Sequence, residues 1–414
     1  MDSGACGIRA IDLEGTIRAE GVASSLVRAR AVMRALGITR LANVTGLDHV
    51  GVPTWMAVRP LALSLSVSQG KGLTHELAQI SALMECIELH HAEHFVPRGR
   101  RRSLRAAAND PSYVHPLLLP IRPDVAIDDR AAVEWIAGHS LADGSVRWVP
   151  RDCIELNSLS SRMQRKFFLG SSNGLASGNT QSEAMLHAVC EVIERDQQSF
   201  WHARREFSLD ARPSRLCLDS VTDPGCRRLL DRCLNAGLEV VVWQVAQEVS
   251  VPCFACALFD RNGKTFYPQR ASGSGCHPYR RIALSRAITE ALQSRLTLIA
   301  GGRDDAYWSA YRQRVRVDDD AGRAWGNTLL VEAAGLDFED VPEARPMTSI
   351  EAMLDWVLEK LSNTGLGEVI VVDLTQSDIR IPVVHVTIAG AEGTINNPGY
   401  TPGPRMQALL AERS

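Results

Sequence analysis

Two segments a hundred residues apart each carry a pair of glutamates at helical spacing in an apolar setting. SALMECIE at 81–88 contains Glu85 and Glu88, and HAVCEVIE at 187–194 contains Glu191 and Glu194. Acids three residues apart lie on one face of a helix, where they repel each other. Because a buried carboxylate without a partner is unfavourable, the two pairs indicate a site that binds cations.

Three predicted helices each show a narrow polar stripe beside an apolar face when the residues are placed about 100° apart. The stripes are Ser81, Glu85, Glu88 and Ala92; Glu183, His187, Glu191 and Glu194; and Arg286, Glu290, Gln293 and Thr297. For one helix alone, a partly solvated face with Arg286 and Glu290 as an i,i+4 ion pair is the simpler interpretation. Three helices with the same arrangement favour convergence on a single site.

The chemistry of such a site follows from its charges. Five or six carboxylates need hard divalent cations, and Mg²⁺ is commonly bound by carboxylates, waters and phosphate oxygens. Arg195 and Arg286 would supply positive charge for the phosphates of a nucleotide. The chain has no G-x-x-x-x-G-K-[ST] loop, so a nucleotide would be bound without a P-loop. A two-metal hydrolase is the alternative, which the scarcity of histidines in the stripes disfavours.

The elements that position these residues alternate without strict βα units, which predicts a mixed α+β fold. Helices are expected at 22–36, 74–95 with Thr74 as N-cap, 181–204, 225–235, 279–300 and 350–363. Strands are expected at 57–68, 132–137, 145–149, 238–245, 251–260, 368–373 and 382–388, with SQGKGL as a turn and 105–130 as a loop.

Composition excludes several classes of protein. The chain of 414 residues is 45% hydrophobic and 22% charged, and its net charge of −3 gives no electrostatic footprint for nucleic acid. It has no apolar run of about 20 residues, no secretory signal and scattered cysteines, which favours a cytoplasmic protein rather than a membrane protein. PRGRRRSLR at 97–105 is interpreted as a solvated turn or loop, and CFAC at 253–256 as small buried side chains.

Long segments around the three stripes resemble the YcaO family, ATP-dependent enzymes that activate backbone amides in peptides. The matching stretches are SLSVSQGKGLTHELAQISALMECIELHHAEHF, SSNGLASGNTQSEAMLHAVCEVIERDQ and SGSGCHPYRRIALSRAITEALQSRLTLIAGGRDD, and the resemblance extends over about residues 15–400. It implies an α+β YcaO-like fold with a glutamate-lined ATP site that holds Mg²⁺. We expect an N-terminal segment over 1–55, a YcaO domain of two or three subdomains over 56–400 and a tail over 401–414.

The resemblance also assigns residues to the site, although it names no catalytic residue. Its Mg²⁺ ligands would be Glu85, Glu88, Glu191, Glu194 and Glu290. Its ATP-binding residues would be Arg18, Ser25, Lys71, Ser81, Asn179, Gln181, Glu183, Arg195 and Arg286.

Two departures from the family pattern bear on the reaction. Leu89 stands where many members have arginine, and Ala176 where some have serine. Azoline-forming members often end in a proline-rich segment whose terminal carboxylate lies near the active site. Here Pro398, Pro402 and Pro404 are followed by ten residues to Ser414, so we do not expect a terminal carboxylate to act as the base.

The stretch ITRLANVTGLDHVGVPTWMAVRP is most similar to the subgroup that is paired with TfuA-type proteins and associated with thioamide formation. The resemblance therefore implies thioamidation of a ribosomally made precursor peptide, with a TfuA-like or leader-binding partner and a homodimeric enzyme. An azoline-forming cyclodehydratase acting on Cys, Ser or Thr is the alternative, and a non-catalytic nucleotide-binding scaffold is a further one.

Overall fold

A computed structural model describes residues 7–95, 97, 99–123, 125, 128–159, 166–206, 214–246, 248–260, 270–305, 335–393 and 399–412. Its helices are α1 (Val22–Val32), α2 (His75–Glu93), α3 (Leu104–Ala108), α4 (Arg151–Ile154), α5 (Gln181–Glu206), α6 (Pro224–Asn235), α7 (Arg280–Ala300), α10 (Ile350–Ser362) and α11 (Pro404–Ala411). None of these described helices combines the length and the hydrophobicity that crossing a membrane would require.

The strands form separate antiparallel sheets around these helices. One three-stranded sheet contains β3 (Arg40–Asn43), β4 (Thr54–Val58) and β5 (Val67–Lys71), and another contains β10 (Leu238–Gln244), β11 (Cys253–Asp260) and β12 (Arg270–Cys276). The largest sheet has the order β6 (Arg100–Ser103), β7 (Ala132–Ser140), β13 (Val369–Asp373), β14 (Val383–Ile388) and β9 (Leu175–Ser177), with β8 (Val146–Pro150) also paired to β7. β1 (Ile11–Asp12) pairs with β2 (Ile17–Arg18). The α+β prediction is confirmed.

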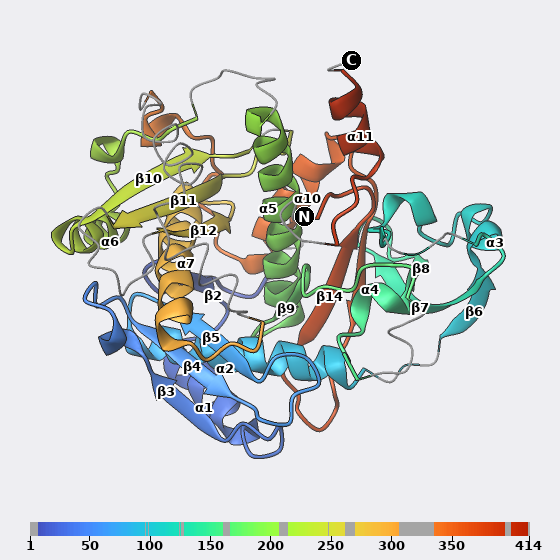
Figure 1. Ribbon diagram of the computed structural model, residues 1–414, viewed down its shortest axis with the longest axis horizontal. Helices are drawn as coiled ribbons and strands as arrows, with labels where there is room; N and C mark the ends of the chain where they lie inside the picture. The colour runs from blue at the N-terminus through green and yellow to red at the C-terminus, as the bar shows by residue number, and fades with distance from the viewer. Residues whose placement is uncertain are drawn as a thin grey trace, which may run out of the picture.

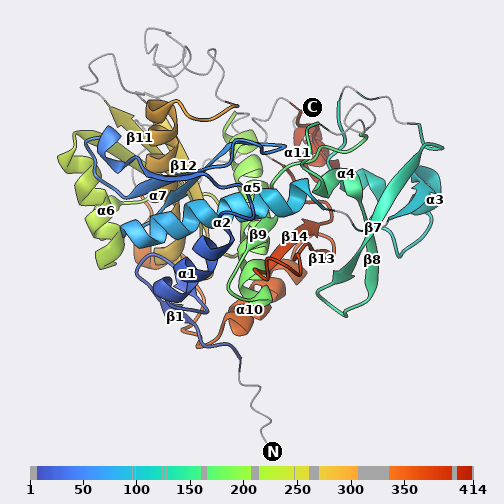
Figure 2. The same ribbon diagram turned by 90° about the horizontal axis from the view of Figure 1, so that it is seen from below.

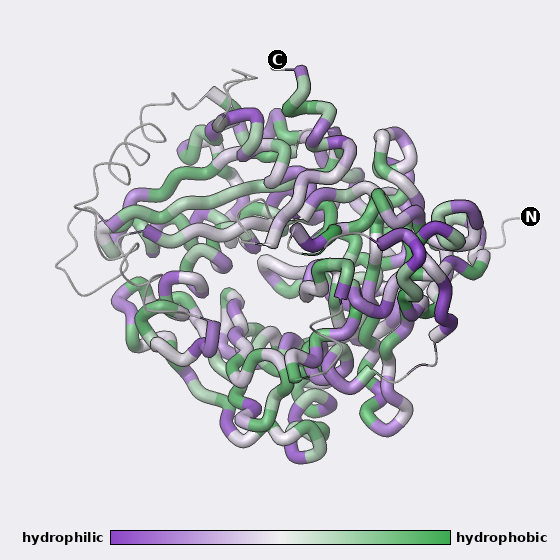
Figure 3. Tube along the Cα trace, turned by 45° about the vertical axis from the view of Figure 1, so that its right-hand side comes forward, coloured by the Kyte–Doolittle hydropathy of each residue, from purple (hydrophilic) through white to green (hydrophobic). Residues whose placement is uncertain are grey.

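Three long helices converge at the centre of the molecule, each from a different sheet. α2 packs on β4 and β5, α5 on β9 and β14, and α7 on β11 and β12. In Figure 1, α5 and α7 stand upright near the centre while α2 passes below them, and the view in Figure 2 agrees. Hydrophobic stretches follow the inner strands and helices, whereas many hydrophilic stretches lie on peripheral turns (Figure 3).

Glycines allow two of these helices to lie very close to their strands. A Cβ atom at Gly70 of β5 would lie 2.1 Å from the main-chain nitrogen of Ala82 in α2. One at Gly273 of β12 would lie 2.2 Å from the main-chain nitrogen of Ala291 in α7. Because any side chain would collide there, these glycines fix the spacing between strand and helix.

Gly70 also explains why the expectation for SQGKGL was wrong. The single strand expected over 57–68 is two strands, β4 and β5, and SQGK belongs to β5 rather than to a turn. Gly70 is required here because a side chain would collide with α2, and not because its backbone has a positive φ angle. Since side chains alternate along a strand, the contact of Gly70 with α2 directs Gln69 and Lys71 to the opposite face, toward α7.

Other expectations are also corrected. Arg100–Ser103 forms β6 and Leu104–Ala108 forms α3, so the basic segment is not a loop. The tail contains α11, whose Met406 and Leu409 pack against Phe200 of α5. The predicted helices at 74–95, 225–235, 279–300 and 350–363 are confirmed within three residues at each end, and Thr74 caps α2 by accepting from Leu77 N. Pro398 and Ser414 lie outside the described residues, and the boundaries at 55 and 400 stay predictions.

Candidate functional site

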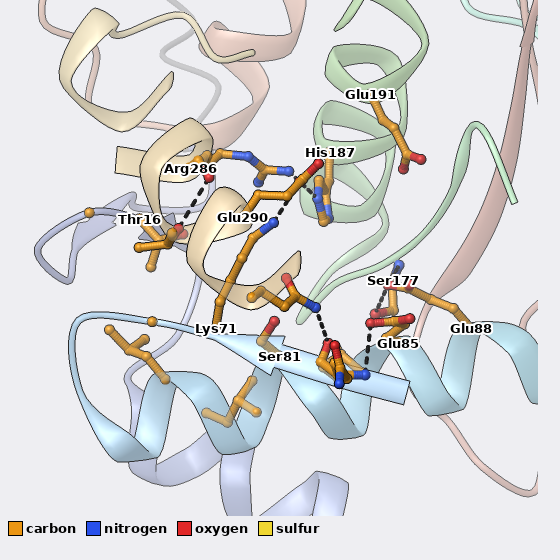
Figure 4. A pocket seen from close by; sticks show the side chains of 18 of the residues that line it. Thr16, Lys71, Ser81, Glu85, Glu88, Ser177, His187, Glu191, Arg286 and Glu290 are labelled. Atoms are coloured by element: carbon orange, nitrogen blue, oxygen red, sulfur yellow. Dashed lines mark hydrogen bonds and ion pairs between the residues drawn. The ribbon is translucent and has the colours of Figure 1, made fainter. Parts of the chain in front are cut away.

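The three polar stripes meet at one cavity of about 420 Å³ between α2, α5 and α7. Every residue of the stripes except Ala92 lines it. Figure 4 shows side chains from all three helices, and Lys71 from β5, directed toward the same space. A helix wheel fixes only the face of each helix, so this convergence depends on the strands that orient the helices against one another.

The two acids of α2 are bound by neutral donors from neighbouring strands. Glu85 accepts a hydrogen bond from the Gln69 main-chain nitrogen at 3.2 Å. Glu88 accepts from the main-chain nitrogen of Ser177 at 2.7 Å and from its hydroxyl at 2.6 Å. Burial raises the pKa of each carboxyl group to about 7, despite these bonds.

The acids of α5 differ in how completely they are paired. Burial, and to a smaller extent the nearby carboxylates of Glu194 and Glu88, raise the pKa of Glu191 to about 8 against the opposing charges of Arg195 and Arg286. Glu194 instead accepts from the Ser274 hydroxyl at 2.6 Å and lies 3.5 Å from Arg195 Nη1. Because the charge of Glu88 on α2 raises the pKa of Glu191 on α5, the acids of the two helices lie in one electrostatic environment.

Glu290 of α7 is the acid with the strongest positive surroundings. Burial alone would raise its pKa, but the Lys71 ammonium at 2.6 Å, followed by Arg195, lowers it to about 2. The ion pair between Arg286 and Glu290 that a single helix suggests is not the contact formed. Arg286 Nη2 instead donates to His187 Nε2 at 2.8 Å, and burial together with Arg286 lowers the pKa of His187 well below its ordinary range.

A second group of predicted residues forms a network around Asn179. The Asn179 Oδ1 atom accepts from Ser25 Oγ at 2.6 Å and from Arg28 Nη2 at 2.7 Å. Its Nδ2 atom donates to Glu183, which also accepts from the Ala19 main-chain nitrogen at 2.8 Å. Arg18 Nη1 lies 3.5 Å from Glu183 Oε1. This network fixes the N-terminal segment to the start of α5.

Of the fourteen residues assigned from sequence, Gln181 is the one that does not line the cavity. Its amide lies at the exposed start of α5 and donates to Asp373 Oδ2 at 2.8 Å. The other thirteen all line the cavity. The assignment did not include Gln69, Ser177, His187 or Arg303, which line it as well. Strand alternation with Lys71 could have indicated Gln69, but no local pattern marks Ser177 or Arg303.

The donor set fits Mg²⁺ bound together with phosphate oxygens. No three His, Cys, Asp or Glu side chains within the described ranges are arranged to hold a metal ion by themselves. Mg²⁺ commonly takes only one or two carboxylates, and phosphates and waters complete its shell. The half-buried acids Glu85, Glu88 and Glu191, whose pKa values are raised, would provide such partial shells, and Lys71 and Arg195 lie close enough to contact phosphates in the same cavity.

Comparisons with known proteins agree with this geometry. Residues 69–392 match the family described as YcaO cyclodehydratase, which binds ATP and Mg²⁺. A protein encoded in the tfuA 3′ region of Rhizobium leguminosarum bv. trifolii is 32% identical over 391 residues, which cover 92% of this chain and 89% of that protein. A protein of Methanothermobacter thermautotrophicus is 31% identical over 363 residues, covering 86% of this chain and 90% of that one.

Solved structures share the fold. YcaO from Methanopyrus kandleri, bound with AMPPCP and Mg²⁺, aligns with a TM-score of 0.74 at 21% identity, over 96% of this chain and 99% of that one. A heterocyclase in complex with substrate and cofactor aligns with a TM-score of 0.78 at 22% identity over 98% of this chain, which spans 57% of the heterocyclase.

The family match and the fold place the protein among the ATP-dependent enzymes that modify peptides and use Mg²⁺. The chain belongs to the YcaO family.

Proposed function

We propose that this enzyme forms a thioamide in a ribosomally made peptide, acting with a TfuA-like partner protein. The observation that supports the thioamide product is the likeness to the Rhizobium protein encoded next to tfuA, at 32% identity over nearly the whole chain. A backbone amide oxygen is a poor leaving group, and the glutamate-lined cavity is suited to the phosphorylation that would activate it.

In this proposal the acids of the three helices bind Mg²⁺. The ligand set would be Glu85, Glu88, Glu191, Glu194 and Glu290. When bound, Mg²⁺ would neutralise the phosphate charge and orient the terminal phosphoryl group. The ATP-binding residues would be Arg18, Ser25, Lys71, Ser81, Asn179, Glu183, Arg195 and Arg286, while Gln181 would act only from outside the cavity.

The reaction would proceed by addition followed by elimination. A sulfide equivalent, delivered by the partner, would attack the carbonyl carbon and form a C–S bond. The resulting oxyanion would take the γ-phosphoryl group of ATP, with ADP as the leaving group. The C–O bond would then break, phosphate would leave, and loss of the sulfur-bound proton would give the C=S group. The task of the chain is chiefly positioning and charge neutralisation.

The second candidate is azoline formation, which the description of the matched family as a cyclodehydratase favours. Here the nucleophile would be a Cys, Ser or Thr side chain of the peptide itself. The oxygen of the preceding amide would be phosphorylated and lost in the same way. The two reactions differ only in the source of the nucleophile, so the same cavity could serve either.

Mass spectrometry distinguishes the products. The enzyme, its neighbouring TfuA-like protein and a peptide encoded nearby would be incubated with ATP, Mg²⁺ and sulfide. Thioamidation would raise the peptide mass by the difference between sulfur and oxygen, whereas cyclodehydration would lower it by one water. A peptide of unchanged mass would contradict both reactions, whether or not ATP is consumed. Loss of activity without the partner would support its role in sulfur or peptide delivery.

A further inference from the structure

The side chain of Gln69 carries a polar atom that has no hydrogen-bond partner in the part of the chain that the structure describes. The side chain lines the cavity, yet only 2% of the residue is exposed to solvent. Its Nε2 atom has no hydrogen-bond partner among the described residues. An unsatisfied buried amide is unfavourable, so one that lies at a cavity indicates a ligand.

The surrounding contacts hold Gln69 in place. Its main-chain nitrogen donates to Glu85 at 3.2 Å, and its main-chain oxygen accepts from Gln293 Nε2 at 3.0 Å. Thr297 Oγ1 contacts Gln69 Oε1. A hydroxyl both donates and accepts, so this contact is satisfied whichever way the Gln69 amide is turned. In either orientation one amide atom has no partner among the described residues.

The stripe on α7 shows which ligand this part of the cavity suits. Along the helix it passes from a cation at Arg286, through the acid Glu290, to the uncharged Gln293 and Thr297. At a rise of about 1.5 Å per residue, Thr297 lies about 16 Å along the axis from Arg286. The cationic end suits phosphate oxygens of a nucleotide, and the acids between suit Mg²⁺ bound to its terminal phosphates. Near the far end, the side chains of Gln69, Gln293 and Thr297 are neutral donors and acceptors that suit a neutral group, and the charged side chains of Glu85 and Arg303 also line the cavity.

Phosphoryl transfer requires the attacking and leaving oxygens to lie roughly in line on opposite sides of phosphorus. If the nucleotide extends from the glutamates toward Arg286, the acceptor must approach from the side of Gln69. The acceptor is a backbone amide, which offers a carbonyl oxygen and an N–H group. A carboxamide pairs with either.

We propose that Gln69, held by Gln293 and Thr297, binds the backbone amide of the peptide substrate beside the glutamate centre. This inference takes its substrate class from the proposed function. Gln69 thus positions the amide for phosphorylation and leaves nucleotide binding to the charged residues of the cavity.

The test measures amide binding without turnover. The full chain would be loaded with Mg²⁺ and AMPPCP, and binding of N-acetylglycine N-methylamide would be followed by saturation-transfer NMR. Variants would be Gln69→Met, which removes the amide, and Gln69→Glu, which keeps its shape but cannot donate. Gln79→Met is the matched control, because Gln79 is also buried, lies outside the cavity lining and already accepts from Arg30.

We expect wild type and Gln79→Met to bind the probe equally, and both Gln69 variants to bind it at least about fivefold more weakly, as for one lost hydrogen bond. AMPPCP affinity should be the same in wild type and Gln69→Met. Equal probe binding by Gln69→Met and wild type, or no binding by wild type, would overturn the inference. So would loss of AMPPCP affinity in a folded Gln69→Met protein. Because no chemical step is involved, a wild-type enzyme that binds the probe but modifies no peptide would count against the proposed function alone.

Discussion

Helix α2 carries a buried carboxylate at Glu93 and two half-buried ones at Glu85 and Glu88, and their surroundings shift the pKa in opposite directions. Near its end, Glu93 accepts from Arg59 at 2.6 and 2.7 Å and from the main-chain nitrogen of Ser64 at 3.0 Å. Burial alone would raise the pKa of Glu93, but the bonds and the charge of Arg59 lower it. One and two turns earlier, the described hydrogen bonds to Glu88 and Glu85 come from neutral donors, and burial raises the pKa of each to about 7.

This comparison distinguishes a carboxylate that stabilises the fold, Glu93, from carboxylates suited to binding a ligand, Glu85 and Glu88. The pair of Arg59 and Glu93 is complete, since the acid has its cation and its hydrogen bonds within the fold. Among the described residues, no ion pair is formed by Glu85, Glu88 or Glu191, and their raised pKa values leave them partly protonated near neutral pH. A ligand that supplies positive charge would favour their ionised form. Raised pKa values on three converging acids therefore identify a site for an external cation.

The largest expected effect is the loss of activity when one of the unpaired acids is neutralised. Glu85→Gln and Glu191→Gln should each lower ATP-dependent peptide modification by about 100-fold or more, because each removes charge that faces the metal-bound phosphates. Steady-state rates with saturating Mg²⁺ would be compared with circular dichroism spectra of the same samples. Wild-type rates in both folded variants would refute the assignment of the stripes.

The same substitution at the paired acid should act on stability instead. Glu93→Gln leaves the Arg59 guanidinium buried without its counter-charge, which should lower the free energy of unfolding by about 3 kcal/mol. Glu85→Gln on the same helix is the control and should leave stability unchanged or higher, because it removes a half-buried acid that forms no ion pair with the described residues. Urea denaturation at pH 7.5 measures both. Equal destabilisation by Glu93→Gln and Glu85→Gln would contradict the distinction between a structural acid at Glu93 and a ligand-binding acid at Glu85.

A smaller effect should appear in the pH dependence of the ligand-free protein. Between the ordinary pKa of about 4.5 and the raised values of about 7 and 8, the folded chain binds more protons at Glu85, Glu88 and Glu191 than the unfolded chain does. Stability from these groups is therefore lost as the pH rises from 5 to 8.

Urea midpoints at pH 6 and pH 8 would show this loss. Glu191→Gln should flatten the dependence, and Mg²⁺ with AMPPCP should stabilise the protein more at pH 8 than at pH 6. Glu290 should contribute nothing over this range, because its pKa of about 2 keeps it ionised throughout. A stability that rises between pH 6 and pH 8 to the same extent in wild type and Glu191→Gln would contradict the raised pKa values.

The sequence was sufficient to predict the helices and the faces that form the cavity. Periodicity identifies a face because it depends only on local geometry, and like charges such as Glu85 and Glu88 mark a face that is not simply solvated. The resemblance then connected three segments that no local pattern could bring together. Thirteen of the assigned residues line one cavity as a result.

Contacts between distant elements could not be predicted in the same way. Arg286 faces Glu290 on a helix wheel, yet it contacts His187 on another helix. Gln181 lies in a stretch that resembles the family motif, but the start of α5 turns it toward Asp373. SQGKG is typical of a turn in sequence, because the sequence alone does not distinguish a glycine required for a positive φ angle from one required for close packing. Each outcome depends on tertiary packing.

The most direct test of the glutamate site is whether binding of the magnesium nucleotide releases protons from the protein. Calorimetric titration of AMPPCP with excess Mg²⁺ at pH 7.5 would be repeated in two buffers with different heats of ionisation, for wild type and Glu191→Gln. Because metal ligands must be deprotonated, the raised pKa values predict proton release that is larger in wild type than in the variant. Equal proton release in both proteins, or nucleotide binding that does not depend on Mg²⁺, would contradict the account.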